Sequence, residues 1–275
     1  MIVDAHQHFW RYNPGRHGWI TDDMAAIRRD FLPKELEQIY RQNDIDGCVA
    51  VQVEQAESEN EFLLAFSRKY PFIRGIVGWV DLQAPNINER LEYYSTEKVI
   101  KGFRHIVQGE SDPNFLLGQD FCRGIGFLSA HNFTYDILVY HQQLVQVEPF
   151  VSRFPNQAFI IDHIAKPAIA KQEIKQWAIH MRAIARYPNV YCKLSGMVTE
   201  ADIKNWTYDQ IALYIDVVLD CFGPSRLVYG SDWPVCLVAA TYEEQFGVIQ
   251  KAIDRLSPTE KKQILGENAI RFYHL

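Results

Sequence analysis

Short apolar runs alternate with longer amphipathic segments along the whole chain. The apolar runs are rich in β-branched and aromatic residues and have the length of buried strands. We predict eight strands from them, at residues 2–5, 47–53, 73–80, 99–104, 135–139, 158–162, 190–194 and 227–229. Apolar residues at helical spacing follow each strand and predict helices at residues 33–42, 59–70, 86–94, 116–130, 141–154, 172–187, 208–222 and 242–255.

Eight strand-then-helix units in 275 residues are typical of the α/β class and of a single (β/α)8 TIM barrel. No Gly/Ser-rich linker or low-complexity segment interrupts them, so we expect one domain over residues 1–275. Enzymes with this fold build their active sites from residues at the carboxyl ends of the strands. Polar residues at those positions are therefore the candidates for chemistry.

Two histidines, His6 and His8, follow the first predicted strand. Residues at i and i+2 of a strand point to the same face, so both imidazoles can enter one pocket, as a metal site or an oxyanion site requires. The alternative is a polar strand end that water satisfies. Polar residues at the ends of the other strands favour a catalytic pocket, and they are Gln52, Glu54, Trp79, Asp81, Arg104, His105, Tyr140, His141, Asp162, His163, Lys166, Lys193, Ser195, Ser231, Asp232 and Trp233.

Residues 9–31 are too many for a simple connection from strand to helix, which predicts a loop over the mouth of the barrel. Its aromatic residues can stack on the apolar face of a sugar, and Trp10 is the first candidate because it is nearest to His8. The alternative is that these aromatic side chains only pack the loop against the barrel.

Composition narrows the partners of the protein. The net charge is −6 and no basic block is present, so nucleic acid and anionic membrane surfaces are not expected partners. No stretch approaches the roughly 20 apolar residues of a membrane helix, and the N-terminus has no signal-peptide pattern. We expect a cytoplasmic protein that acts on a small molecule. Its five scattered cysteines, without a C-x-x-C pair, are expected to be reduced thiols.

Five motifs in order give the chain a family resemblance: DAHQHFW at 4–10, KGFRH at 101–105, IDHIAKP at 161–167, YCKLSG at 191–196 and YGSDWP at 229–234. They resemble the amidohydrolase superfamily. Within it they are similar to the sugar-acid lactonases, which include fuconolactonase-like and rhamnonolactonase-like enzymes, and to the related pyrone-dicarboxylate lactonases. The resemblance covers essentially the whole chain. It is much less specific for the substrate than for the family.

The resemblance implies hydrolysis of a lactone ring. Asp232 would act as general base on water, because an aspartate held near cations can orient and deprotonate water beside a carbonyl. His163 would bind a metal, hydrogen-bond the oxyanion or assist the water. The alternatives are a helix N-cap for Asp232 and a structural hydrogen bond for His163. The catalytic residues that we predict are Asp232, His163, His6 and His8.

Substrate contacts are expected from other residues at the strand ends. Arg104 and Lys166 suit a substrate carboxylate or the ester oxygen, although each can instead be a surface charge. Neighbouring strand residues face opposite ways, so only one of Arg104 and His105 is expected to point inward. The substrate-binding residues that we predict are Arg104, His105, Lys166, Trp10, Glu54 and Trp233.

The resemblance leaves the use of a metal open. His6, His8 and Asp232, with or without His163, can hold one zinc ion with an open coordination position. A binuclear site is not expected, because the fourth strand ends in Arg104 and not in a metal-binding lysine. The lactonase branch also includes members that look able to work without metal, in which the same histidines would donate hydrogen bonds to the carbonyl.

Two other functions remain alternatives. A metal-dependent decarboxylase or C–C hydrolase of the same superfamily would use similar histidines and a full set of metal ligands. A non-catalytic barrel that binds sugar acids would keep the pocket without a competent base. Replacement of Asp232 separates the lactonase from the binding protein, because only the lactonase would lose turnover.

Overall fold

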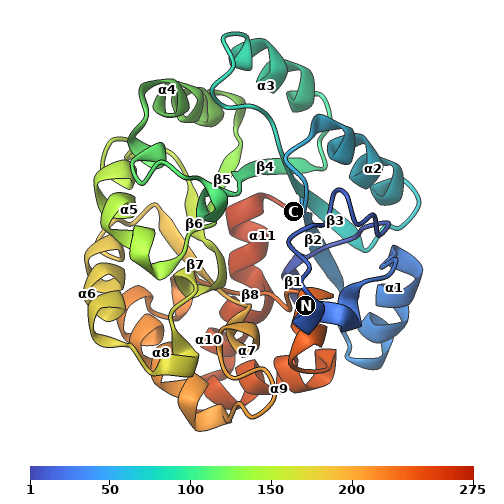
Figure 1. Cartoon of the computed structure of the whole chain (residues 1–275), viewed down its shortest axis with the longest axis vertical. Coiled ribbons are helices and arrows are strands. Elements are labelled where there is room, and N and C mark those ends of the chain that lie inside the picture. The colour runs from blue at the N-terminus through green and yellow to red at the C-terminus, as the bar shows by residue number, and fades with distance from the viewer.

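The computed structural model describes all 275 residues and contains one sheet of eight parallel strands in chain order. A ring of helices surrounds the strands (Figure 1). The strands are β1 (Val3–Gln7), β2 (Gly47–Val51), β3 (Ile73–Gly78), β4 (Ile100–His105), β5 (Thr134–Ile137), β6 (Phe159–Ile161), β7 (Val190–Leu194) and β8 (Leu227–Tyr229). The predicted single (β/α)8 barrel is confirmed.

The barrel closes between β1 and the segment that directly follows β8. Asp232 N–H donates to the His6 carbonyl at 2.8 Å, and His8 N–H donates to the Trp233 carbonyl at 2.7 Å. The buried Asp4 carboxylate supports this seam, because it accepts hydrogen bonds from Ser231 N–H at 2.8 Å and from the Tyr40 hydroxyl at 2.9 Å. The closure brings the first strand together with the segment after the last strand, at residues that the sequence predicts to be catalytic.

All eight predicted helices are present, with shifted ends. They are α1 (Pro33–Gln42), α2 (Glu57–Ser67), α3 (Ile87–Ser95), α4 (Gln119–Leu128), α5 (Leu144–Val151), α6 (Lys175–Ile184), α8 (Tyr208–Phe222) and α9 (Tyr242–Ala252). Helices α4 and α5 are shorter than predicted because single 3-10 turns, Phe115–Leu117 and His141–Gln143, precede them. The sequence pattern did not predict α7 (Met197–Glu200), α10 (Pro258–Lys262) or α11 (Asn268–Tyr273).

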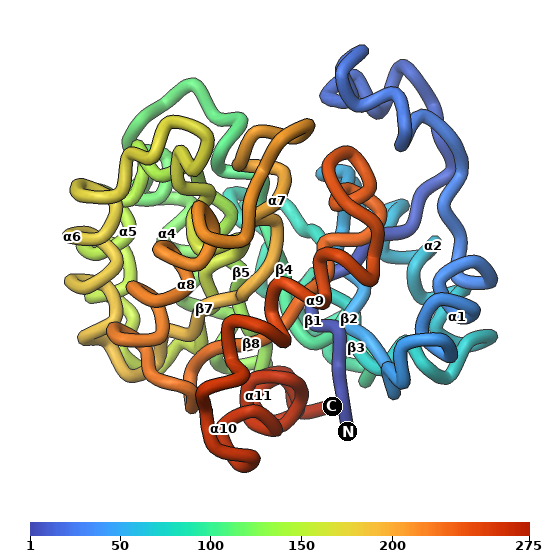
Figure 2. The backbone as a smooth tube through the Cα atoms, turned by 90° about the horizontal axis from the view of Figure 1, so that it is seen from below, coloured from blue at the N-terminus to red at the C-terminus, as the bar shows by residue number.

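Two hydrophobic cores hold the barrel together. The larger one fills the space between the strands and the helices. The smaller one lies inside the barrel, where aliphatic side chains of β1, β2, β3, β6 and β8 meet Ala269, Phe272 and Tyr273 of α11. Helix α11 therefore plugs the end of the barrel at which both chain termini lie (Figures 1 and 2). The opposite end, at the carboxyl ends of the strands, is the one that can receive a ligand.

The long segment 9–31 lies at that opposite end, away from the termini (Figure 2). Trp10 and Phe31 exchange two backbone hydrogen bonds of 3.0 Å, so the two ends of the loop are pinned together. The short helix η1 (Asp22–Ile27) lies within it. The predicted loop at the mouth of the barrel is confirmed.

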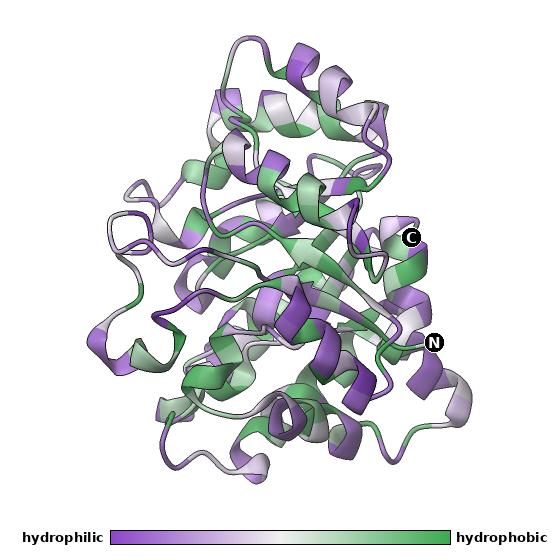
Figure 3. Cartoon of the chain, turned by 90° about the vertical axis from the view of Figure 1, so that its right-hand side faces the viewer, coloured by the Kyte–Doolittle hydropathy of each residue, from purple (hydrophilic) through white to green (hydrophobic).

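The hydropathy pattern fits these layers. Hydrophobic residues dominate the central strands, whereas hydrophilic residues are frequent on the outer helix turns and loops (Figure 3). None of the helices has both the length and the apolar character needed to cross a bilayer.

Candidate active site

His6 and His8 enter the same pocket, as their spacing predicts. The register of β1 against β2 shifts between Asp4 and Gln7, which changes the alternation of side chains along the strand. Val3 and Ala5 pack in the inner core, and His6, the residue after Ala5, also points into the barrel. The two Nε2 atoms of His6 and His8 lie 3.2 Å apart.

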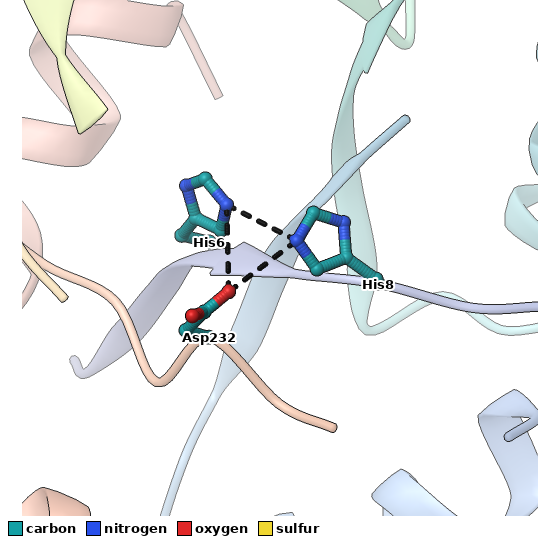
Figure 4. A group of neighbouring side chains, drawn as sticks. All are labelled: His6, His8 and Asp232. Atoms are coloured by element: carbon teal, nitrogen blue, oxygen red, sulfur yellow. Dashed lines mark hydrogen bonds and ion pairs between the residues drawn. The ribbon is translucent and has the colours of Figure 1, made fainter. Parts of the chain in front are cut away.

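Asp232 faces this pair of histidines (Figure 4). Its Oδ1 lies 3.4 Å from His8 Nε2, 3.8 Å from His6 Nε2 and 3.9 Å from His163 Nε2. The residue has a left-handed backbone, with φ of 59°, which aims the carboxylate back into the barrel mouth. The N-cap residue of the following turn, Val235–Val238, is Pro234 and not Asp232. The N-cap alternative for Asp232 is therefore excluded.

Burial sets the charge of these groups. Loss of solvent lowers the pKa of His6, His8 and His163, so the three imidazoles are neutral at neutral pH. For Asp232, burial acts to raise the pKa, but the neighbouring His163 and His8 side chains outweigh it and hold the pKa below its usual value. The site thus combines an ionised carboxylate with neutral imidazoles.

His6 Nε2, His8 Nε2 and Asp232 Oδ1 have the spacing of a metal site. Their separations of 3.2, 3.4 and 3.8 Å are close to the distance of about 3.3 Å that separates nitrogen or oxygen ligands around tetrahedral zinc. His8 Nδ1 donates to the Val51 carbonyl at 2.7 Å, which leaves the lone pair of Nε2 directed at the other two atoms. Three acceptors that converge in this way need a cation or shared protons between them, so the residues fit a single divalent ion.

A buried charge network lies directly behind His6. Lys193 Nζ lies 2.5 Å from Asp136 Oδ2, 2.9 Å from Asp162 Oδ1 and 3.1 Å from His6 Nδ1. Asp162 Oδ1 is also 3.3 Å from His6 Nδ1, so a carboxylate and an ammonium group both hold the outer nitrogen of this imidazole. Tyr273 from the plug helix α11 donates to Asp136 at 2.9 Å. The network connects the closed end of the barrel to the site.

The two carboxylates of this network differ. Burial raises the pKa of Asp136 to about 6, with Lys193 opposing the rise. Burial acts in the same direction on Asp162, but Lys193, His6 and Arg104 together hold its pKa well below the usual value. Asp162 is the permanent negative charge behind His6, and it orients the imidazole.

Arg104 points inward and His105 points outward, as strand alternation requires. Arg104 Nη1 lies 3.0 Å from Asp162 Oδ2 and 3.3 Å from His6 Nε2, and Nη2 donates to the backbone carbonyl of Gln52. His105 Nε2 donates to Glu110 at 2.7 Å, and its ring stacks on Phe115 outside the barrel. The guanidinium of Arg104 is buried, and its two Nη atoms contact Asp162, His6 and Gln52, so a substrate contact from Arg104 stays a prediction.

Four consecutive residues from His163 to Lys166 have positive φ angles, between 45° and 59°. A left-handed turn costs roughly 1–2 kcal/mol for each non-glycine residue, so the surrounding structure must hold it in place. Lys166 N–H donates to the His163 carbonyl at 2.8 Å, and His163 Nδ1 is hydrogen-bonded to Ser195 Oγ at 2.9 Å. The strained turn brings His163 and Lys166 to the mouth of the barrel together.

This fold and site can be compared with known proteins. The sequence profile of the amidohydrolase family matches residues 3–275. The chain belongs to the amidohydrolase family. Its curated relatives include L-fucono-1,5-lactonases from Burkholderia multivorans, 38% identical over 100% of this chain and 96% of the relative, and from Burkholderia ambifaria, 32% identical over 99% and 95%.

A solved structure extends the similarity to three dimensions. An amidohydrolase from Burkholderia multivorans, crystallised with bound zinc, superimposes on this amidohydrolase with a TM-score of 0.97. The two are 38% identical, and the match covers 100% of this chain and 99% of the other. In this amidohydrolase, His6, His8 and Asp232 form the triangle of side chains that could hold a metal ion.

Two other predicted contact residues of this amidohydrolase, Trp10 and Trp233, have buried indole rings. Trp10 is 2% exposed and donates its indole N–H to the Arg29 carbonyl, and Trp233 is fully buried between Phe9 and Phe31. Both indoles pack against aromatic residues of the loop 9–31, so substrate contacts from them stay predictions.

Glu54 lies beside the same loop, within 3.6 Å of His17 and 3.7 Å of Arg16. The buried Glu59 carboxylate fixes the backbone here, because it accepts the N–H groups of Val53 at 2.8 Å and Glu54 at 2.6 Å. Burial raises the pKa of Glu59 to about 8. A substrate contact from Glu54 stays a prediction, since its carboxylate already faces two side chains of the loop.

Sequence reasoning missed Asp136, Tyr273 and Glu200 as parts of the site. The sequence does contain a signal for Asp136, because a single charged residue inside an apolar strand needs a buried partner of opposite charge. Glu200 and Tyr273 lie on α7 and α11, which the hydrophobic pattern did not predict, so no strand end pointed to them. Glu200 lies 3.8 Å from Lys166 at the mouth of the barrel.

Gly196 makes room for His163, which yields a testable prediction. It has φ of 65°, and a Cβ there would lie 2.5 Å from His163 Nδ1. We expect Gly196→Ala to displace the imidazole and lower kcat/KM by about 10-fold or more, since small misplacements of catalytic groups have large effects. Gly223→Ala is the matched control, because Gly223 has φ of 67° but open space around it. Thermal melting should show a loss of stability in both variants, whereas activity should fall only in Gly196→Ala; equal activities would contradict this role of Gly196.

Proposed function

We propose that this amidohydrolase hydrolyses the ester ring of a sugar-acid (aldono-) lactone, and that L-fucono-1,5-lactone is the first substrate to test. The observation that carries the proposal is the ionised, buried Asp232 carboxylate among three neutral imidazoles at the open end of the barrel. Relatives at 38% and 32% identity over nearly the whole chain bear the name L-fucono-1,5-lactonase, which supports this substrate class.

The reaction adds one water molecule across the ester bond. Asp232 takes a proton from water while the water oxygen bonds to the lactone carbonyl carbon, which forms a tetrahedral oxyanion. The oxyanion collapses, the bond to the ring oxygen breaks, and the proton passes to that leaving oxygen. The product is the open-chain hydroxy acid. Because an aspartate with a lowered pKa is a weak base, polarisation of the carbonyl must contribute much of the rate enhancement.

The other residues of the site have separate roles in the proposal. His163 Nε2, 3.9 Å from Asp232 Oδ1, lies where it can hydrogen-bond the attacking water or the oxyanion. Lys166 is the cation at the mouth of the barrel and is suited to a substrate oxygen. Arg104, Asp162 and Lys193 position His6.

His6, His8 and Asp232 are the residues that would hold a divalent ion. Such an ion, when bound, supplies Lewis-acid polarisation of the carbonyl or lowers the pKa of a water molecule. Binding of an ion by these residues and dependence of the reaction on that ion are separate properties, and separate experiments test them.

A metal-binding prediction follows from the triangle. Zinc in excess should raise the melting temperature of the metal-stripped wild type by several degrees, because a ligand that binds only the native state stabilises it by about 2.7 kcal/mol at one hundred times its Kd. His8→Ala should lose this shift, and His180→Ala, on the exposed face of α6, should keep it. Equal shifts in the two variants would place the zinc elsewhere.

The proposed activity is tested by proton release from purified protein against a panel of fucono-, rhamnono- and galactono-lactones and pyrone dicarboxylate lactone. We expect rapid hydrolysis of a deoxy-sugar lactone. Hydrolysis that survives a chelator assigns His6 and His8 to hydrogen bonding, whereas loss on chelation and recovery with zinc assigns them to a metal. Failure on every lactone would reject the proposal and favour a decarboxylase, a C–C hydrolase or a binding protein. A cytoplasmic location and the absence of nucleic-acid partners stay predictions.

A further inference from the structure

Glu200 lines a polar pocket together with Lys166. The pocket has a volume of about 300 Å³, and among the residues that line it are Tyr140, His141, Lys166, Lys171 and Glu200. Lys166 is three residues after His163 on the left-handed turn, so this turn connects the pocket to the proposed reaction centre. His141 Nδ1 donates to the Lys166 carbonyl at 2.9 Å, which ties two walls of the pocket together.

The Glu200 carboxylate has Lys166 as its cationic partner and is partly open to the pocket. Its side chain is 22% exposed, and its neighbour in an ion pair is Lys166, whose Nζ lies 3.8 Å from Glu200 Oε1. Burial raises the pKa of Glu200, with Lys166 opposing the rise and the charge of Asp232 adding to it. A half-buried carboxylate of this kind is stabilised when a ligand supplies donors.

The charges of the pocket select the class of ligand. The Glu200 carboxylate would repel an anionic ligand, and Lys166 and Lys171 would repel a cationic ligand. A neutral polyol avoids both conflicts, because its hydroxyl groups donate to a carboxylate and accept from an ammonium. The Tyr140 ring, 5.5 Å from Lys166 Nζ, adds an apolar surface of the kind that stacks on sugar rings.

We propose that Glu200 and Lys166 form the sugar-recognition subsite, in which the Glu200 carboxylate accepts hydrogen bonds from ring hydroxyls of the substrate while Lys166 donates to a neighbouring oxygen. This inference rests on the proposed lactonase function. It attributes the selectivity of the lactonase for hydroxylated rings to Glu200 and Lys166. In this role Glu200 acts on binding and leaves the attack of water to Asp232.

The test compares two lactones that share a six-membered ring: L-fucono-1,5-lactone, which carries hydroxyl groups, and δ-valerolactone, which carries none. Glu200→Ala should lower kcat/KM for the hydroxylated lactone by about 10- to 100-fold, mostly through KM, because a hydrogen bond to a charged group is lost. The same variant should change kcat/KM for δ-valerolactone less than about 2-fold. Glu200→Gln, which keeps one acceptor oxygen, should lie between Glu200→Ala and the wild type.

Glu148→Gln is the matched control, because Glu148 is a half-exposed glutamate in an ion pair with Arg186 on the outer helices. A loss confined to kcat, or an equal loss on both lactones, would overturn the subsite and give Glu200 a catalytic or structural role. If the wild type opens neither lactone, the proposed function fails by itself. The subsite is then judged by thermal shift with L-fucose, which should stabilise the wild type but not Glu200→Ala; equal shifts would overturn it.

Discussion

Asp232→Asn is expected to lower kcat/KM for the lactone by about 100-fold or more while the protein stays folded. The asparagine has nearly the same shape, but it cannot accept the proton of the attacking water, and general-base catalysis contributes typically 10²–10⁴-fold. The Asp232 side chain is 6% exposed and its Oδ1 lies within 3.9 Å of three imidazoles, so bulk water cannot easily replace it as the base. Initial rates by proton release, with circular dichroism as a check on folding, measure the effect.

Asp254→Asn is the matched control for this loss. Asp254 is 84% exposed and contacts Lys261 on the outer surface, so its amide variant should keep the wild-type rate. If Asp232→Asn retained more than about a tenth of the wild-type activity, another group would be the base. His163 would then be the next residue to test, because its Nε2 lies 3.9 Å from Asp232 Oδ1.

Lys193→Met is expected to cause the largest loss of stability. Lys193 is fully buried between Asp136 and Asp162, and removing one partner of a buried ion pair costs typically about 3–5 kcal/mol, because the remaining charges are left without compensation. For a chain of this size each kcal/mol lowers the melting temperature by about 2–4 °C, so we expect a fall of roughly 6–20 °C. Thermal melting by differential scanning calorimetry measures it.

The loss of stability in Lys193→Met should increase with pH. Without Lys193 the folded-state pKa values of Asp136 and Asp162 rise, and Asp136 starts from about 6 in the wild type. A carboxyl group whose folded pKa lies above its unfolded pKa stabilises the protein at low pH and loses that contribution as pH rises through the folded pKa. The gap between wild type and Lys193→Met should therefore be wider at pH 8 than at pH 5.

Two further variants test the cause of this loss. Lys261→Met removes a surface lysine and should change stability by less than about 0.5 kcal/mol. Adding Asp136→Asn to Lys193→Met should recover part of the lost stability, because one uncompensated carboxylate is removed. A gap between wild type and Lys193→Met that does not change with pH would contradict an ionised network.

The expected strands and helices were confirmed because their signals are local. A buried parallel strand is a short apolar run and an outer helix is an amphipathic segment, and both periods can be read from the sequence without knowing the partners. Helices α7, α10 and α11 were missed because they have 4, 5 and 6 residues, too few to show a helical period. The plug of the inner core and the position of Glu200 were missed with them.

The sequence by itself determined the barrel and the end of it that carries the site. The His-x-His spacing put His6 and His8 in one pocket, and strand-end positions brought Asp232, His163 and Lys166 to the same mouth. Only the tertiary structure decided which of these groups are free to act. Arg104 is held by Asp162 and Gln52, Trp10 and Trp233 pack against aromatic residues of a loop, and Glu200 is left with an accessible carboxylate. The reason is physical, because burial and the choice of charge partner depend on residues far apart in the chain, whereas the period of a strand does not.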